Sequence, residues 1–293
     1  MYTTLIEPAE LAAPLSRSAA ADADWTILDC RFDLARPDWG AGAYATGHVP
    51  NALYAHLDRD LSGPVTPVSG RHPLPSVERL AETFGGWGID ETVQVVVYDQ
   101  GNGAFAARLW WLLRWAGHPK VAVLNGGFAA WQQAMLPTDT TPGVRRPRVF
   151  TPHPGAANTV VSTAELERLL AAGALENGAS MLVDARGADR FAGENETIDP
   201  VAGHIPGARN HPFLRNVDAR GRFLAAEELR ERWRTTLGGE ASAARAIAMC
   251  GSGVTACHNL LALAVAGLPG ARLYAGSWSE WIRDAGRPIA RGA

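Results

Sequence analysis

Cysteine is scarce in this sequence. Its 293 residues include three cysteines, Cys30, Cys250 and Cys257, and no two of them are separated by two residues. A set of cysteines that is so small, and odd in number, excludes a disulfide-stabilised scaffold. It is typical of a protein that stays in a reducing compartment. Cys250 and Cys257 alone are too few ligands for a zinc site. We therefore expect no bound metal and a cytoplasmic location.

Long apolar runs are also absent. No stretch approaches the roughly 18 apolar residues that a membrane span requires. The first residues lack the basic and apolar segments of an export signal. Charge of one sign is not in excess either, since the net charge is −3 and the isoelectric point is near 6.2. These absences argue against a role at a membrane and against general binding of nucleic acids.

The sequence does contain a duplication. Its length and its hydrophobic content of 47% indicate a folded protein with two domains. Four sequence blocks occur twice, in the same order and about 150 residues apart. The paired positions are Asp29 with Asp184, His48 with His204, Asp99 with Cys250, and Trp131 with Trp281. We predict two copies of one domain over residues 1–136 and 159–293, joined by a proline-rich linker over residues 137–158.

Each copy alternates short apolar strands with helical segments. This order predicts the α/β class, with a parallel sheet flanked by helices in each domain. The Gly-His pair occurs in both copies, including the one with Asp99 at the position of Cys250, so we expect His48 and His204 to be structural. Asp29 and Asp184 are likewise expected to bond the loops that follow them.

Cys250 is the candidate nucleophile. It follows an apolar strand predicted over residues 246–249 and precedes a helix predicted over residues 257–266. Backbone N–H groups and a helix N-terminus at such a position favour the thiolate, which is the reactive form of cysteine. The alternative is a buried, inert cysteine. The flanking Gly251 and Gly253, with the hydroxyl of Ser252, favour the reactive thiol.

These residues carry a family resemblance. The chain resembles the two-domain rhodanese-fold sulfurtransferases over nearly its whole length, and residues 276–281 resemble that family's C-terminal signature. The loop over residues 250–256 is similar to that of 3-mercaptopyruvate sulfurtransferases. Thiosulfate-type members have basic residues at the positions of Gly251 and Ser252. The resemblance implies two tandem rhodanese-like domains, of which the first lacks the catalytic cysteine.

The resemblance also implies a reaction. Cys250 would take a sulfur atom from 3-mercaptopyruvate as a persulfide and pass it to a thiol, a thioredoxin-like protein or cyanide, with no cofactor. Backbone N–H groups of the loop would stabilise the negative charge. The loop residues implied in substrate binding are Gly251, Gly253, Val254 and Thr255.

Four further site residues follow from the resemblance. It implies a proton-transferring set formed by Ser252, His72 and Asp58, in which Asp58 orients the imidazole. It also implies that Arg190 binds the carboxylate of the donor. The family's second carboxylate-binding arginine has no counterpart, because residues 192–200 contain no arginine and are acidic. Thiosulfate therefore stays open as an alternative donor. We expect Arg186 to form a salt bridge at a strand end.

Two other functions are alternatives to sulfur transfer. Phosphatases of related fold place an arginine six residues after the cysteine, and here that position is Ala256. A non-catalytic sulfur-binding module is the other alternative, since the first copy has Asp99 where the second has its cysteine. The intact loop around Cys250 favours the enzyme.

Overall fold

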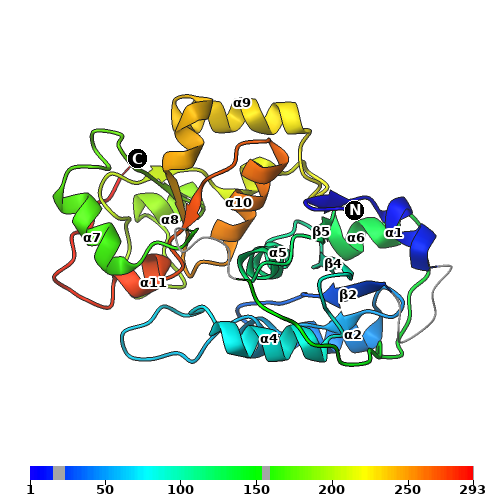
Figure 1. Ribbon diagram of the computed structural model, residues 1–293. Coiled ribbons are helices and arrows are strands. Elements are labelled where there is room, and N and C mark those ends of the chain that lie inside the picture. The colour runs from blue at the N-terminus through cyan, green and yellow to red at the C-terminus, as the bar shows by residue number, and fades with distance from the viewer. Residues whose placement is uncertain (16–23, 154–158, 293) are drawn as a thin grey trace. The chain divides into compact units, whose positions relative to one another are not determined.

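The computed structural model describes residues 1–15, 24–153 and 159–292 (Figure 1). The chain forms two compact units, which are described separately. The first unit comprises Met1–Ser62, Pro75–Gly155 and Val217–Phe223, and the second comprises Gly63–Leu74, Ala156–Asn216 and Leu224–Ala293. Each unit thus contains a short segment from the other half of the sequence, whereas the predicted domains are continuous. The boundaries at residues 136 and 159 stay a prediction, and residues 154–158 of the predicted linker lie outside the described residues.

The first unit contains a five-stranded parallel sheet. Its strands have the order β1-β5-β4-β2-β3, and every pair is parallel. Their bounds are β1 Leu5–Ile6, β2 Trp25–Asp29, β3 Leu53–Tyr54, β4 Gln94–Tyr98 and β5 Val121–Leu124. All five residues of the central strand β4 are buried. A continuous apolar strand of this kind forms because both faces of a parallel sheet are covered.

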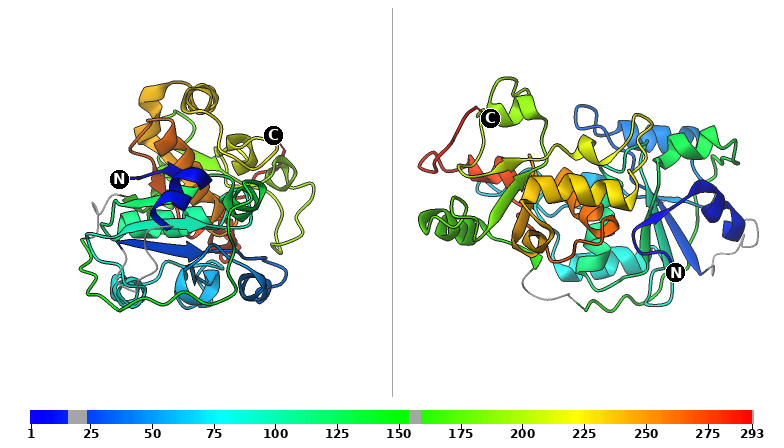
Figure 2. Two further views of the ribbon diagram at one scale, coloured as in Figure 1. Left: turned by 90° about the vertical axis from the view of Figure 1, so that its right-hand side faces the viewer. Right: turned by 90° about the horizontal axis from the view of Figure 1, so that it is seen from above.

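Helices cover this sheet (Figures 1 and 2). They are α1 Pro8–Leu15, α2 Trp39–Thr46, α3 Leu57–Asp60, α4 Val77–Gly86, α5 Ala106–Trp115 and α6 Gly127–Gln133. Helices α1, α2 and α6 bury Leu11, Tyr44 and Trp131 against the face formed by Ile27 and Val96. Helix α5 packs against β4 and β5.

The second unit repeats this arrangement with four parallel strands in the order β7-β6-β8-β9. They are β6 Met181–Asp184, β7 Arg209–Asn210, β8 Ala246–Met249 and β9 Arg272–Leu273. The order matches β3-β2-β4-β5 of the first unit. A single bridge between Val160 and Leu273 takes the place of β1. The predicted α/β class, with a parallel sheet in each of two copies, is confirmed.

The helices of the second unit flank its sheet. They are α7 Thr163–Ala171, α8 Ala188–Ala192, α9 Ala226–Leu237, α10 Thr255–Val265 and α11 Ser277–Trp281, with 3-10 helices η2 Phe213–Asn216 and η3 Glu240–Arg245. Helix α10 packs against β8 and β9. It begins at Thr255, shortly after β8 ends at Met249, so Cys250 lies in the short loop between them.

The duplicated histidines have the same surroundings in both units. His48 stacks on Tyr44 with ring centroids 3.9 Å apart, and its Nδ1 lies 2.7 Å from the backbone oxygen of the same residue. His204 stacks on Phe191 at 3.7 Å, and its Nδ1 lies 2.8 Å from that residue's backbone oxygen. Both histidines are buried. Their predicted structural role is confirmed.

The duplicated aspartates end strands β2 and β6. Asp29 binds Arg31 at 2.6 Å, and Asp184 binds Arg186 at 2.7 Å. Each aspartate also accepts the backbone N–H of its arginine at 2.9 Å. Burial opposes the charge of Arg186, but the carboxylates of Asp184 and Glu196 outweigh it and raise the pKa of the guanidinium. The predicted strand-end salt bridge is confirmed.

A buried polar network joins η2, α9 and α10. His211 stacks on Trp233 with ring centroids 4.0 Å apart, and its Nε2 lies 3.1 Å from Oδ1 of Asn216. That oxygen also accepts from Nε1 of Trp233, so Nε2 of His211 donates and its Nδ1 accepts from the hydroxyl of Thr236 at 2.7 Å. Burial lowers the pKa of His211 from 6.5 to about 4.

This histidine makes stability depend on pH. Between about pH 6.5 and pH 4 the unfolded chain binds a proton at His211 that the folded chain excludes, so stability falls as the pH falls, by up to about 1.4 kcal/mol per pH unit. We expect His211→Gln to remove this part of the slope in urea unfolding at pH 7, 6 and 5. His153→Gln changes an exposed histidine and is the control. Parallel curves for wild type and His211→Gln would contradict the assignment.

Candidate active site

Cys250 lies in a loop between β8 and α10, as predicted. Its side chain is buried, and the backbone N–H of Gly253 donates to its Sγ over 3.1 Å. The loop is bound to α11 at three points. Cys250 N donates to Oγ of Ser277 over 3.0 Å, Trp278 N donates to the backbone oxygen of Cys250 over 3.0 Å, and Ser279 N donates to that of Gly251 over 2.8 Å. The sulfur therefore occupies a fixed position with an N–H group directed at it.

The equivalent loop of the first unit has a carboxylate side chain in place of the thiol. The carboxylate of Asp99 stands at the position of Cys250, and four backbone N–H groups donate to it. Its Oδ1 accepts from Gly101 and Gly103 over 3.0 Å each, and its Oδ2 accepts from Phe105 over 2.9 Å and Ala106 over 3.3 Å. A loop of this shape at a strand end thus presents several N–H groups to one negative group.

The two glycines of the Cys250 loop meet different needs. Gly253 has φ +79°, and a Cβ there would stand 2.3 Å from the backbone oxygen of Ala275. Gly251 has ordinary backbone angles, but a Cβ there would stand 2.9 Å from Nη2 of Arg71 and 3.6 Å from Nη2 of Arg190. Gly253 shapes the backbone of the loop, and Gly251 leaves room for two arginines beside it.

Val254 and Thr255 end the loop. Val254 is buried at the N-cap position of α10, and Thr255 is the first residue of that helix. Their backbone lies at the helix N-terminus, where the partial positive charge of the helix dipole is concentrated. The next turn holds Cys257, whose buried thiol donates to the backbone oxygen of Gly253 over 3.2 Å. Cys257 therefore joins the first turn of α10 to the Cys250 loop through this hydrogen bond.

His72 and Ser252 are in contact. Nδ1 of His72 lies 2.7 Å from Oγ of Ser252, and both side chains are buried. His72 belongs to the segment Gly63–Leu74, which packs within the second unit although it comes from the first half of the chain. Two bonds hold this segment in place. Arg71 N donates to Oγ of Ser279 over 3.0 Å, and Arg283 Nε donates to the backbone oxygen of Ser69 over 3.1 Å. The catalytic role of His72 and Ser252 is a proposal taken up below.

Asp58 belongs to the first unit. It lies in the first turn of α3, whose N-cap is His56, and Nδ1 of His56 accepts the backbone N–H of Asp58 over 3.1 Å. His72 belongs to the second unit. The expected pairing of Asp58 with His72 therefore stays a prediction.

Arg190 lies on α8 and binds two buried carboxylates. Its Nη2 is 2.9 Å from Glu196 and 3.0 Å from Asp199. Burial disfavours the charged form of Glu196, but bonds from Arg190 and from the N–H groups of Asp199 and Ile198 outweigh it and lower the pKa of that carboxyl. The acidic segment that departs from the family pattern is thus the segment that binds Arg190.

Arg71 is a site residue that the sequence interpretation missed. Its Nη1 forms an ion pair with Oδ1 of Asp199, whose Oδ2 binds Arg190. Asp199 therefore bridges two guanidinium groups, both of them beside Gly251. The one signal in the sequence was its position directly before His72. No spacing rule connects residue 71 with residue 199.

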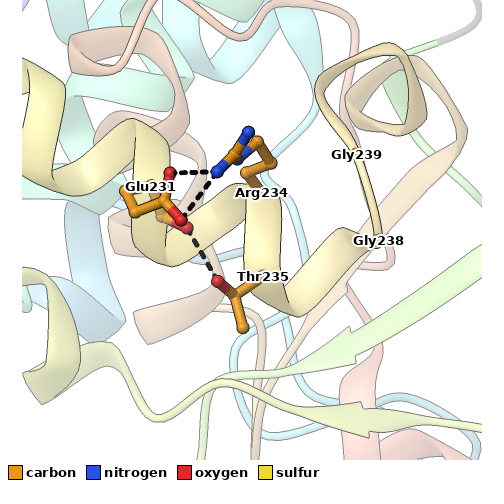
Figure 3. Close-up of a pocket in the computed structure, with 5 residues that line it drawn as sticks. All are labelled: Glu231, Arg234, Thr235, Gly238 and Gly239. Atoms are coloured by element: carbon orange, nitrogen blue, oxygen red, sulfur yellow. Dashed lines mark hydrogen bonds and ion pairs between the residues drawn. The ribbon is translucent and has the colours of Figure 1, made fainter.

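A surface cavity lies at the C-terminal end of α9 (Figure 3). It has a volume of about 370 Å³ and is lined by Glu231, Arg234, Thr235, Gly238 and Gly239. The Glu231 carboxylate binds Arg234 at 2.7 Å. None of the five lining residues has a nucleophilic thiol or a titratable imidazole, so this cavity is not the candidate active site.

The described part of the chain has neither a metal-binding cluster nor a membrane-spanning helix. Over residues 1–15, 24–153 and 159–292 there is no group of three or more His, Cys, Asp or Glu side chains arranged to hold a metal ion. Among the same residues, no helix has both the length and the apolar character needed to cross a membrane. Cys30, Cys250 and Cys257 all lie in the described ranges, are buried, and form no disulfide there.

Comparison with known proteins decides the family. The sequence pattern of the Rhodanese-like domain matches residues 7–134 and again residues 162–284, which together cover most of the chain. The chain belongs to the rhodanese-like domain family. The predicted resemblance and the predicted pair of rhodanese-like domains are confirmed.

Relatives of this rhodanese-like protein are sulfurtransferases. A Pseudomonas aeruginosa protein named as a probable 3-mercaptopyruvate sulfurtransferase is 48% identical over 290 residues, covering 98% of each chain. SseB of Mycobacterium tuberculosis, whose name places it among the thiosulfate sulfurtransferases, is 40% identical over 294 residues, covering 98% of this chain and 97% of its own. The structure of SseA from Escherichia coli, described as that of a 3-mercaptopyruvate sulfotransferase, is 30% identical with a TM-score of 0.77, covering 95% of this chain and all of that one. The expected enzyme class is confirmed.

The loop geometry predicts a strict need for glycine at position 253. In Gly253→Ala the new methyl group meets the oxygen of Ala275, and the backbone keeps a left-handed φ, so we expect a loss of about 2 kcal/mol or more in urea unfolding. Gly42→Ala is the matched control, since nothing lies within 4 Å of its Cβ position inside α2. A gain of up to about 1 kcal/mol is expected there. Equal effects at both positions would contradict the account of the loop.

Proposed function

We propose that this rhodanese-like protein moves a sulfur atom from 3-mercaptopyruvate to a thiol or cyanide acceptor through a persulfide on Cys250. The observation that supports this most is the buried Cys250 sulfur, which accepts the N–H of Gly253, with Ser252 of the same loop bonded to His72 at 2.7 Å. The anion-binding loop around Asp99 supports it further, because a terminal persulfide is negatively charged.

In the first half-reaction the thiolate of Cys250 attacks the sulfur of 3-mercaptopyruvate. A sulfur–sulfur bond forms and the carbon–sulfur bond of the donor breaks. The electron pair of the broken bond remains on carbon and gives the enolate of pyruvate. The proton of the donor thiol balances this charge, since its transfer to the enolate carbon leaves pyruvate and an anionic persulfide.

Ser252 and His72 are placed to carry that proton. The Ser252 hydroxyl lies two residues beyond the nucleophile, and His72 is its hydrogen-bond partner. A hydroxyl bonded to an imidazole can accept a proton on one side and release one on the other. Asp58 is proposed to orient His72, as the family resemblance implies.

In the second half-reaction the acceptor attacks the outer sulfur. The sulfur–sulfur bond of the persulfide breaks, its electron pair returns to Cys250 as thiolate, and the acceptor leaves as a persulfide or, from cyanide, as thiocyanate. A small thiol or a thioredoxin-like protein would serve. A cytoplasmic location fits this proposal, because reduced thiols are abundant there.

Thiosulfate is the second candidate donor. It is supported by relatives such as SseB and the rat thiosulfate sulfurtransferase, which is 32% identical over 292 residues. The residues next to Cys250 favour 3-mercaptopyruvate instead. Gly251 and Ser252 carry no charge, and the arginines near them are paired with Glu196 and Asp199. The electrostatic attraction for a dianion such as thiosulfate is weaker here than it would be beside unpaired cationic groups.

A direct comparison of donors tests this proposal. We expect kcat/KM with 3-mercaptopyruvate to exceed that with thiosulfate by tenfold or more, roughly the effect of 1.4 kcal/mol in transition-state stabilisation. Cyanide is the common acceptor, and thiocyanate is measured. Cys250→Ser should abolish both activities. Cys257→Ser is the control, since it changes the other cysteine of this region and leaves Cys250 in place. A preference for thiosulfate would overturn the donor, and activity in Cys250→Ser would overturn the nucleophile.

The proton-transfer proposal predicts slow turnover without loss of folding. Ser252→Ala and His72→Ala should each lower kcat with 3-mercaptopyruvate by roughly a hundredfold or more. Because both act in one transfer, the double variant should lose little more than either single variant. His153→Ala, at an exposed histidine, is the control. Multiplied losses in the double variant would show that the two residues act independently and would remove the shared role.

A further inference from the structure

Two arginines stand beside the residue that follows the nucleophile. The nearest guanidinium atoms lie 2.9 Å (Arg71 Nη2) and 3.6 Å (Arg190 Nη2) from the Cβ position of Gly251. The side chains of Arg71 and Arg190 are 28% and 18% exposed, so both are partly shielded from water. Partial burial strengthens the attraction of a guanidinium for an anion.

The two arginines differ in which donors are already used. Arg190 directs its Nε and Nη2 edge at Glu196, with Nε 3.1 and 3.0 Å from the two carboxylate oxygens, and the same Nη2 also reaches Asp199. The edge formed by Nε and Nη2, one of the two that can bind a carboxylate with two parallel bonds, is therefore occupied in Arg190.

Arg71 has the opposite arrangement. It binds Asp199 through Nη1, the atom outside that edge. Its Nε is buried and has no hydrogen-bond partner among the described residues. Its Nη2 is the atom nearest Gly251. The edge formed by Nε and Nη2 is thus not used by Asp199, and its Nη2 lies beside the loop. A buried Nε–H without an acceptor is costly unless a ligand supplies one.

Backbone bonds set the position of this edge. Ser279 donates its N–H to the backbone oxygen of Gly251 and accepts the N–H of Arg71 on its Oγ. Asp199, whose side chain is 1% exposed, then fixes the guanidinium end. Arg71 is therefore held at both ends relative to the cysteine loop, which preorganises it for binding.

We propose that Arg71 binds the carboxylate of the donor through Nε and Nη2, with Asp199 positioning its guanidinium group. This inference rests on the proposed function, since it assigns the residue that recognises the α-keto acid. It also supplies a second cation where the segment over residues 192–200 offers none. Arg190 also stands beside the loop, with its Nη1 3.8 Å from the Cβ position of Gly251.

The test compares two donors that differ only in the carboxylate. These are 3-mercaptopyruvate and its neutral analogue mercaptoacetone, with cyanide as acceptor. In Arg71→Ala we expect KM for 3-mercaptopyruvate to rise by roughly tenfold to a hundredfold with kcat nearly unchanged, because the carboxylate contact exists before and during the reaction. With mercaptoacetone, wild type and Arg71→Ala should have the same kcat/KM.

Two more variants control for charge and for folding. Arg71→Lys keeps the charge but cannot form two parallel bonds, so its KM should lie between those of wild type and Arg71→Ala. Arg79→Ala removes an exposed arginine of the first unit, whose recorded ion pair is with the exposed Glu82, and should leave KM unchanged. Circular dichroism and the melting temperature check the folding of each variant.

The outcomes separate this inference from the proposed function. An unchanged KM in Arg71→Ala, or an equal loss with mercaptoacetone, would overturn the role of Arg71 while the reaction stands. A wild-type protein that releases no pyruvate from 3-mercaptopyruvate would overturn the proposed function, and the role of Arg71 with it.

Discussion

Backbone N–H groups that converge at the end of one strand are the constraint on which this site depends. In the first unit four such groups donate to the carboxylate of Asp99, and in the second unit the N–H of Gly253 donates to the sulfur of Cys250. Asp99 follows β4 and precedes α5, and Cys250 follows β8 and precedes α10. Both strands lie in the interior of their parallel sheets. Duplication has thus produced two loops of one kind, of which one holds a fixed carboxylate and the other a sulfur.

The surroundings of the second loop extend this constraint to side chains. Ser279 bonds both Gly251 and Arg71, and Asp199 bonds both Arg71 and Arg190. Through these bonds the positions of two guanidinium groups are tied to the backbone of the loop. Glu196 and Asp199 also balance the charge of the two arginines. The site therefore combines an N–H group directed at the sulfur with two arginines whose charge is largely balanced.

Much of this organisation could be predicted from the sequence because it rests on local patterns. The duplicated blocks predict two parallel sheets, and the apolar run before Cys250 with the glycines after it predicts a strand, a loop and a helix. The pairs Asp29 with Arg31 and Asp184 with Arg186 are two residues apart and equally local. The contact of His72 with Ser252 spans 180 residues, and only the family resemblance brought these two residues together.

What the sequence could not predict depends on packing between distant segments. The segment Gly63–Leu74 belongs to the second unit, although the rest of that unit begins only at Ala156. Arg71 and Asp199 are 128 residues apart, and no periodicity links them. By sequence, the acidic residues 192–200 contain no counterpart of the family's second carboxylate-binding arginine. In the structure, Glu196 and Asp199 of that segment hold the arginines in place.

Mass spectrometry of the protein after brief treatment with 3-mercaptopyruvate tests the central claim most directly. The account predicts a gain of about 32 Da, the mass of one sulfur atom, located by peptide mapping on Cys250 and lost when cyanide is added. An unmodified Cys250, or sulfur found instead on Cys30 or Cys257, would contradict it.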